Sequence, residues 1–184
     1  TIGFNTISYH DSNELIFKLV RSMVKVWVVC NNYNLEKYEE ENQMDINDKK
    51  YGKKPYIVNI EDATVRNDTY RTTMWTGEKL QVTVMSIKPN DDIGLEVHHD
   101  IDQFIRIEEG KGLCKMGPTE DNLNFEQEVK DDDAVFVPAD MWHNIVNTGD
   151  KPLKLYTIYA GPDHIPGTIH ETHDDARNDP NEQD

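Results

Sequence analysis

The sequence predicts an all-β fold, a single-domain antiparallel β-barrel or jelly roll. Three observations predict it: short segments in which apolar and polar residues alternate, turn signals at regular spacing, and little helical periodicity between residues 55 and 160. The predicted strands cover 56–60, 69–75, 79–87, 113–116, 122–129, 134–137, 142–147 and 153–159, with further strands in the segment 94–108. A length of 184 residues suits one such domain.

The barrel is expected to span residues 55–160, with an N-terminal and a C-terminal segment outside it. Residues 1–54 form an N-terminal extension, in which alternation of Val24, Val26 and Val28 with their neighbours indicates a strand over 24–30 before a polar linker. Residues 161–184 are acidic and weakly apolar, which predicts a solvated C-terminal tail. The tail histidines, His164, His170 and His173, are expected to be solvated rather than ligands.

Composition limits the partners of the chain. Asp and Glu number 35 against 19 Lys and Arg, a net charge of −16, which argues against nucleic acid and anionic membranes. The two cysteines, Cys30 and Cys114, do not make a disulfide framework, so a reducing, cytoplasmic compartment is expected. We expect no membrane span and no signal peptide, because lysine and arginine interrupt the only apolar candidate and Thr1 begins no basic segment.

Four side chains that can bind a metal are spaced so that they can converge. Glu96 and His98 are two residues apart, so on a strand they share one face, while His99 faces away. A turn would then place Gln103 on the same inner face of the next strand, and His143 would begin a third. The pattern predicts a metal cup formed by Glu96, His98, Gln103 and His143.

These residues resemble the two motifs of the cupin superfamily, G-x5-H-x-H-x(3–4)-E-x6-G and G-x5-P-x-G-x2-H-x3-N. The second motif fits at Pro138, His143 and Asn147, with Asp140 in place of its glycine. The resemblance extends over about half of the chain and implies a double-stranded β-helix.

The first motif departs from the cupin pattern. Its two histidine positions hold Glu96 and His98, and its glutamate position holds Gln103. The resemblance therefore implies a Glu-His-Gln-His set around one divalent ion, Zn, Mn, Fe or Ni. Glu96 is either a ligand or a catalytic base, and Gln103 is either a ligand or a hydrogen-bond partner of Glu96 or of a metal-bound water.

Three functions are open for this site. The chain is similar to small single-domain cupins grouped with mannose-6-phosphate isomerase-like proteins, which implies an isomerase for a small carbonyl, sugar or sugar-phosphate substrate, with Glu96 moving the proton. An Fe(II)-dependent dioxygenase is the alternative, because two histidines and a carboxylate are typical of such enzymes. A metal- or sugar-binding module without turnover is the third. A homodimer formed through the 24–30 strand is also expected.

Overall fold

The structure is a computed structural model and describes residues 54–181. In this part of the chain the strands are β1 (Arg71–Thr76), β2 (Gln81–Ile87), β3 (Gln103–Glu109), β4 (Lys111–Gly117), β5 (Phe125–Lys130), β6 (Ala134–Val137), β7 (Trp142–Asn147), β8 (Leu153–Tyr159) and β9 (Ile169–His170). The helices are α2 (Ile60–Arg66) and α3 (His173–Asn178). The predicted all-β fold is therefore confirmed.

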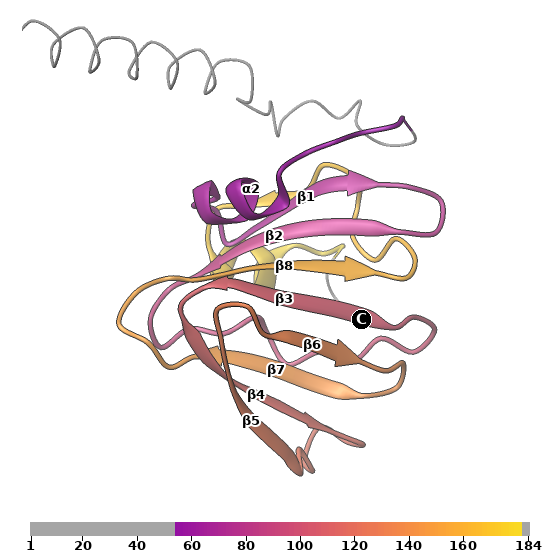
Figure 1. The fold of residues 1–184 in the computed structure, drawn as a ribbon. Coiled ribbons are helices and arrows are strands. Elements are labelled where there is room, and N and C mark those ends of the chain that lie inside the picture. The colour runs from indigo at the N-terminus through magenta and orange to yellow at the C-terminus, as the bar shows by residue number, and fades with distance from the viewer. Residues whose placement is uncertain (1–53, 182–184) are drawn as a thin grey trace, which may run out of the picture. The chain divides into compact units, whose positions relative to one another are not determined.

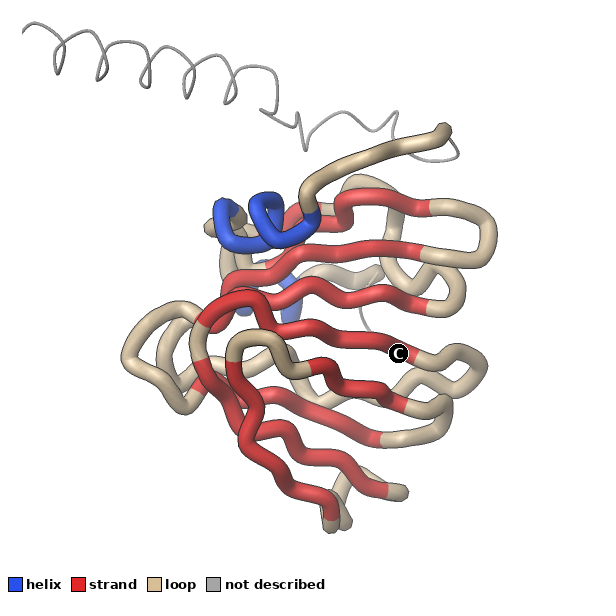
Figure 2. Tube along the Cα trace, in the orientation of Figure 1, coloured by secondary structure: helices blue, strands red, loops and turns tan. Residues whose placement is uncertain are grey.

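The strands form two sheets, which Figure 1 and Figure 2 show layered against each other. The larger sheet has the order β6-β3-β8-β2-β1-β9, and the smaller one has the order β5-β4-β7. Every ladder between these strands is antiparallel. This is the double-sheet arrangement expected of a jelly roll.

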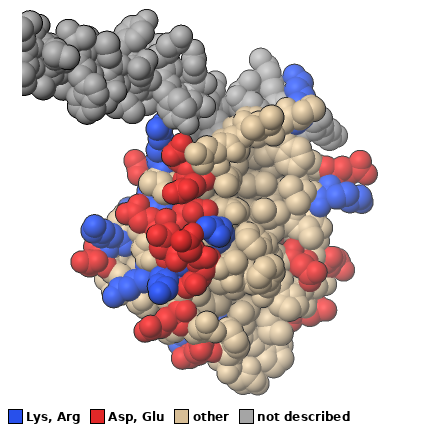
Figure 3. All heavy atoms as spheres, in the orientation of Figure 1, with Lys and Arg blue, Asp and Glu red and all other residues tan. Residues whose placement is uncertain are grey.

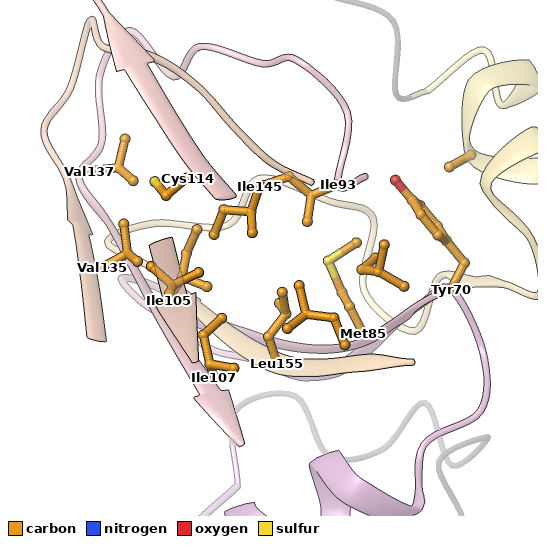
Figure 4. Packing of buried hydrophobic residues seen from close by; sticks show 14 residues of the cluster. Tyr70, Met85, Ile93, Ile105, Ile107, Cys114, Val135, Val137, Ile145 and Leu155 are labelled. Carbon is orange, nitrogen blue, oxygen red and sulfur yellow. The ribbon is translucent and has the colours of Figure 1, made fainter. Parts of the chain in front are cut away.

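Apolar side chains from both sheets meet in one core, shown in Figure 4. Ile105 and Ile107 of β3 and Leu155 of β8 come from the larger sheet, and Ile145 of β7 comes from the smaller one; all four are at most 1% exposed. Burying one such side chain completely stabilises the fold by about 1.5–3 kcal/mol. Because side chains alternate along a strand, the core parity of β3 also turns Gln103 inward.

The chain passes from the larger sheet to the smaller one at Gly110, between β3 and β4. Gly110 has φ +94°, a conformation that side chains rarely adopt, and a Cβ there would lie 3.0 Å from the carbonyl oxygen of Pro152. These steric limits explain why the last position of the first cupin-like motif is a glycine.

The outer face of the larger sheet carries exposed aromatic residues. Phe104 of β3 packs edge-on against Phe136 of β6, with ring centroids 5.2 Å apart, and Phe136 is 71% exposed. On the face seen in Figure 3, most charged side chains lie at the left and others at the right edge, with a broad uncharged area between them. The strand alternation thus places aromatic rings in solvent as well as aliphatic ones in the core.

The predicted strand over 56–60 is wrong. Residues 55–59 have no regular structure, and α2 begins at Ile60. Asn59 caps this helix by accepting a hydrogen bond from the Asp62 N–H (3.3 Å), and Glu61 and Asp62 place negative charge in the first turn. Both features favour a helix start over a strand.

The predicted solvated tail is also wrong as far as residue 179. β9 pairs with β1, and α3 begins with a capping box in which Thr172 and Asp175 bond to each other's backbone. His164, His170 and His173 are all buried. Their rings contact the Tyr159 hydroxyl, Asp179 and Asp91 respectively, at 3.0, 3.0 and 2.6 Å. These partners offset the cost of burying polar rings. Such contacts with distant residues are not visible in the composition of the segment.

The predicted strand over 24–30 lies outside the described residues. The homodimer that depends on it stays a prediction. Among residues 54–181 no helix has the length and apolar character needed to cross a membrane.

Candidate metal centre

Glu96, His98 and His143 come together on the inner side of the barrel. A ligand atom from each lies within 4.8 Å of those of the other two, and no other such group of His, Cys, Asp or Glu occurs within residues 54–181. Glu96 Oε1 is 3.2 Å from His143 Nε2 and 3.5 Å from His98 Nε2. Three of the four predicted ligands therefore gather around one point.

The segment that carries Glu96 and His98 is not the regular strand that was predicted. It is extended chain fixed by single bridges, of which Glu96–His143 is one. Glu96 and His143 exchange backbone hydrogen bonds of 3.1 and 2.9 Å, which puts their side chains on the same face. His99 faces the other way, 74% exposed beside Asp140, as its parity predicted.

Asp140 explains how the loop before β7 tolerates the loss of the motif glycine. It has φ +64°, in the left-handed region where glycine is favoured and Asp is one of the tolerated replacements. Its N–H donates to the His98 carbonyl oxygen at 2.8 Å. The substitution therefore keeps the turn and ties it to a candidate ligand.

In their neutral form, the two histidines would present lone pairs to the centre of the cluster. His143 Nδ1 lies 3.0 Å from the Met141 carbonyl oxygen and must donate to it, so in the neutral ring Nε2 carries the lone pair. His98 Nδ1 lies 3.2 Å from Asp163 Oδ1, which has the same consequence for its Nε2. Both Nε2 atoms are buried and face Glu96 Oε1, at 3.2 Å from His143 and 3.5 Å from His98, without the geometry of a hydrogen bond. Buried nitrogens that face one carboxylate and lack a hydrogen bond fit a divalent metal ion.

The charges at this point are strongly coupled. Burial alone would raise the pKa of Glu96, but His143, His98 and Arg71 hold it well below its usual value. Burial alone would lower the pKa of His98, but Asp163 and Glu96 raise it to about 10. Since a metal ligand must be deprotonated, an ion that binds here displaces a proton from His98.

Gln103 lies on the inner face, as predicted, and is 3% exposed. Its Nε2 donates to the Thr157 hydroxyl at 3.0 Å, and its Oε1 is buried without a hydrogen-bond partner. This leaves the oxygen as the atom that would serve an ion or a water. Its role as fourth ligand or hydrogen-bond partner stays a prediction.

Two charged residues at the site were missed from the sequence. Arg71 of β1 is 4% exposed, and its Nη2 lies 3.7 Å from Glu96 Oε2. Asp163 follows β8 and reaches His98 from the C-terminal segment. Neither belongs to a motif, and their positions depend on pairing between distant parts of the chain, so no local signal marks them.

A cleft of about 740 Å³ opens beside the cluster. Its walls include Glu96, His98, Arg71, Asp163 and Trp142. This volume lies in the range of sites for small molecules. A ligand in the cleft would therefore meet the candidate metal site and a buried arginine together.

Comparison with known proteins identifies the family. The family model of the cupin domain matches residues 83–159, which include all four predicted ligands. The uncharacterized protein YrkC of Bacillus subtilis (strain 168) is 48% identical over 168 residues, covering 91% of this chain and 88% of YrkC. The chain belongs to the cupin family.

Two further proteins are similar to this cupin. The uncharacterized protein L612 of Acanthamoeba polyphaga mimivirus is 40% identical over 115 residues, covering 62% of the cupin and 70% of L612. The crystal structure of BH2720 from Bacillus halodurans has a TM-score of 0.67 and 56% identity, and covers 68% of the cupin and 95% of BH2720. The cupin fold implied by the motifs is therefore established.

Proposed function

We propose that this cupin is an enzyme that binds one divalent metal ion through Glu96, His98 and His143. One observation carries the proposal: two buried histidine nitrogens and a carboxylate oxygen converge within 4.8 Å. Holding a carboxylate and two imidazole nitrogens together in a buried place costs free energy, which coordination to a cation would recover.

The ligand atoms narrow the choice of ion. Two imidazoles and a carboxylate suit Fe(II), Mn, Zn or Ni. Cys114, the one cysteine among the described residues, lies in the apolar core and away from the cluster, so a closed thiolate zinc site does not fit. Three protein ligands, or four with Gln103, leave a position for substrate.

The reaction that this ligand set supports best is an oxygenation. Two histidines and one carboxylate form the ligand set of many Fe(II)-dependent oxygenases. Glu96 Oε1 contacts both histidines, which favours its role as a ligand over that of a free base. The metal, when bound, would supply the redox chemistry, while this chain holds it and shields it in the cleft.

A sugar or sugar-phosphate isomerase is the second candidate, and Arg71 favours it. Its guanidinium lies beside Glu96 Oε2, the carboxylate oxygen turned away from the histidines. There Glu96 could move a proton between adjacent carbons while Arg71 offsets the negative charge of an enediolate or a phosphate. In either reaction, Arg71 favours a small anionic or oxygen-rich substrate despite the acidic composition of the chain.

Two measurements test the metal site and the reaction class. Protein purified without chelator is analysed for metal, and metal-free protein is titrated with Fe(II), Mn(II), Zn(II) and Ni(II). We expect one ion per chain. The Fe(II) form is then exposed to nitric oxide, which needs an open coordination position and gives a ferrous–nitrosyl EPR signal without any knowledge of the substrate.

The two candidate reactions differ in what they consume. Oxygen uptake with small oxygen-rich acids supports the oxygenase, and deuterium exchange from solvent into sugar phosphates supports the isomerase. Failure to bind any of the four ions would overturn the proposed function. The alternative would then be a module that binds a sugar without a metal ion and without turnover.

A further inference from the structure

We infer that Asp163 is a positioning residue of the metal site, and that the C-terminal segment 161–165 completes this site from outside the cupin motifs. The inference rests on the proposed metal binding of Glu96, His98 and His143. It goes further because it assigns a role to a residue beyond the matched domain, which ends at residue 159.

The geometry gives Asp163 a direct hold on one ligand. Its Oδ1 lies 3.2 Å from His98 Nδ1, while the other ring nitrogen, Nε2, faces Glu96. A carboxylate accepts, so it fixes the proton on Nδ1 and the lone pair on Nε2. The ring is also 5.4 Å from that of Tyr159 in an edge contact, which limits its rotation. A carboxylate that holds a metal-bound histidine in this way tunes both its orientation and its basicity.

The backbone of the segment that carries Asp163 is held by Gln81, independently of the Asp163 carboxylate, whose Oδ2 also lies 3.5 Å from His164 Nε2. Gln81, fully buried in β2, accepts hydrogen bonds at its Oε1 from the N–H groups of Asp163 (3.0 Å) and His164 (2.8 Å). Its Nε2 donates to the His164 carbonyl oxygen at 2.8 Å. Since these bonds join Gln81 to the backbone of the segment, a change of the Asp163 side chain leaves the segment attached.

A second pair of the same kind supplies a matched control. His99 Nδ1 and Asp140 Oδ1 are 3.0 Å apart, but both side chains are 74% exposed and His99 points away from the cluster. Asp140→Asn removes the same charge from the same type of pair and keeps the backbone N–H that donates to the His98 carbonyl oxygen. Asn also tolerates the left-handed backbone at this position. Comparison with the Asp163 variants therefore separates the effect of losing a negative charge from the effect of losing the contact that positions His98.

The experiment measures the affinity for Zn²⁺ and for Co²⁺ by competition with a chromophoric chelator. The variants are Asp163→Ala, Asp163→Asn and Asp140→Asn, beside the unchanged chain. We expect Asp163→Ala to weaken both affinities by about 10–100-fold, the usual effect of losing such a partner. The affinities of Asp163→Asn should lie between those of Asp163→Ala and the unchanged chain, because its amide oxygen still accepts a hydrogen bond from His98 Nδ1 but carries no charge. Asp140→Asn should match the unchanged chain.

Hydrogen exchange at residues 161–165 provides the second measurement. Full protection in Asp163→Ala with weaker metal binding supports a positioning role. If Asp163→Ala loosens the segment, the Asp163→Asn variant decides, and an affinity equal to that of the unchanged chain overturns the inference. Equal affinities for Asp163→Ala and the unchanged chain overturn it as well. If the unchanged chain binds neither of these ions nor Fe(II), Mn(II) or Ni(II), the proposed function itself has failed.

Discussion

Glu96 and His143 are joined twice, once through the backbone and once through their side chains. Their main chains exchange two hydrogen bonds, and Glu96 Oε1 lies 3.2 Å from His143 Nε2. The same pairing that closes the barrel at this point therefore sets the distance between two candidate ligands. His98 is held differently, by Asp163 at its other ring nitrogen and by the Asp140 N–H at its carbonyl oxygen.

The first prediction concerns the histidines. His98→Ala and His143→Ala should each remove most of the bound metal, because each deletes a buried nitrogen of the cluster. His99→Ala is the control and should keep full metal, since its ring is exposed on the other side. Metal content is measured beside circular dichroism, which should still report the β fold. Full metal in the His98 and His143 variants would contradict the site.

The second prediction concerns Gln103. Gln103→Ala should weaken metal binding far less than His98→Ala, because a neutral amide oxygen is a poorer ligand than an imidazole. Thr157→Val removes the hydroxyl that holds Gln103 Nε2 and should have a still smaller effect. Chelator competition gives both values. A loss as large as that of His98→Ala would make Gln103 a full ligand.

The third prediction concerns the attachment of the C-terminal segment. Gln81→Ala leaves two N–H groups and one carbonyl group without their partner, and each unsatisfied buried group costs about 1–3 kcal/mol. Residues 161–165 should then exchange their amide hydrogens faster, and metal affinity should fall although Asp163 is unchanged. Gln127→Ala, at an exposed position of β5, is the matched control. Unchanged exchange in Gln81→Ala would show that other contacts hold the segment.

The fourth prediction concerns Cys114. Burial raises the pKa of its thiol to about 11 from a reference of 9.0, so the thiolate fraction at pH 8 falls about 100-fold. In a Cys30→Ser chain, the folded protein should react with DTNB at least 100-fold more slowly than the same chain in denaturant. Rapid reaction of the folded chain would mean that the core opens easily around β4.

The fifth prediction concerns the pH dependence of stability at Asp91. Burial raises the pKa of this carboxyl, but the His173 hydrogen bond and the Asp92 N–H outweigh it and the pKa lies below 3.8. A lowered pKa in the folded state means that the stabilisation is present above about pH 4 and is lost as the pH falls further.

Asp91→Asn should therefore lower the free energy of unfolding at pH 7, by about 1 kcal/mol for a part-buried charged hydrogen bond, and by less at pH 3. Urea unfolding at the two pH values measures this, with Asp121→Asn as an exposed control. An equal cost at both pH values would show that the charge of Asp91 does not contribute.

Most of the fold could be predicted because its strands alternate locally. Strands β3, β6 and β7 each bury every second side chain, and this pattern is visible without any tertiary information. Helices α2 and α3 were missed because they are short. The signal for α3, a threonine followed three residues later by an aspartate, was nevertheless present at Thr172 and Asp175.

The candidate site could be predicted only in part. Glu96, His98 and His143 follow from two motifs and from strand parity. Arg71 and Asp163 do not, because each reaches the cluster from a strand or segment that lies far from the motifs in sequence. The spacing of a motif describes what one stretch of backbone presents, whereas these contacts depend on which stretches are neighbours.

The attachment of residues 161–165 through Gln81 also sets the order in which the parts of the site are assembled during synthesis. Synthesis from the N-terminus delivers β1 to β8 and all three candidate ligands by residue 159. Residues 161–165 arrive afterwards, and the backbone of Asp163 and His164 then forms its hydrogen bonds with the Gln81 side chain. A nascent chain, or one cut by a protease after residue 160, thus holds every candidate ligand but lacks the carboxylate that contacts His98 Nδ1.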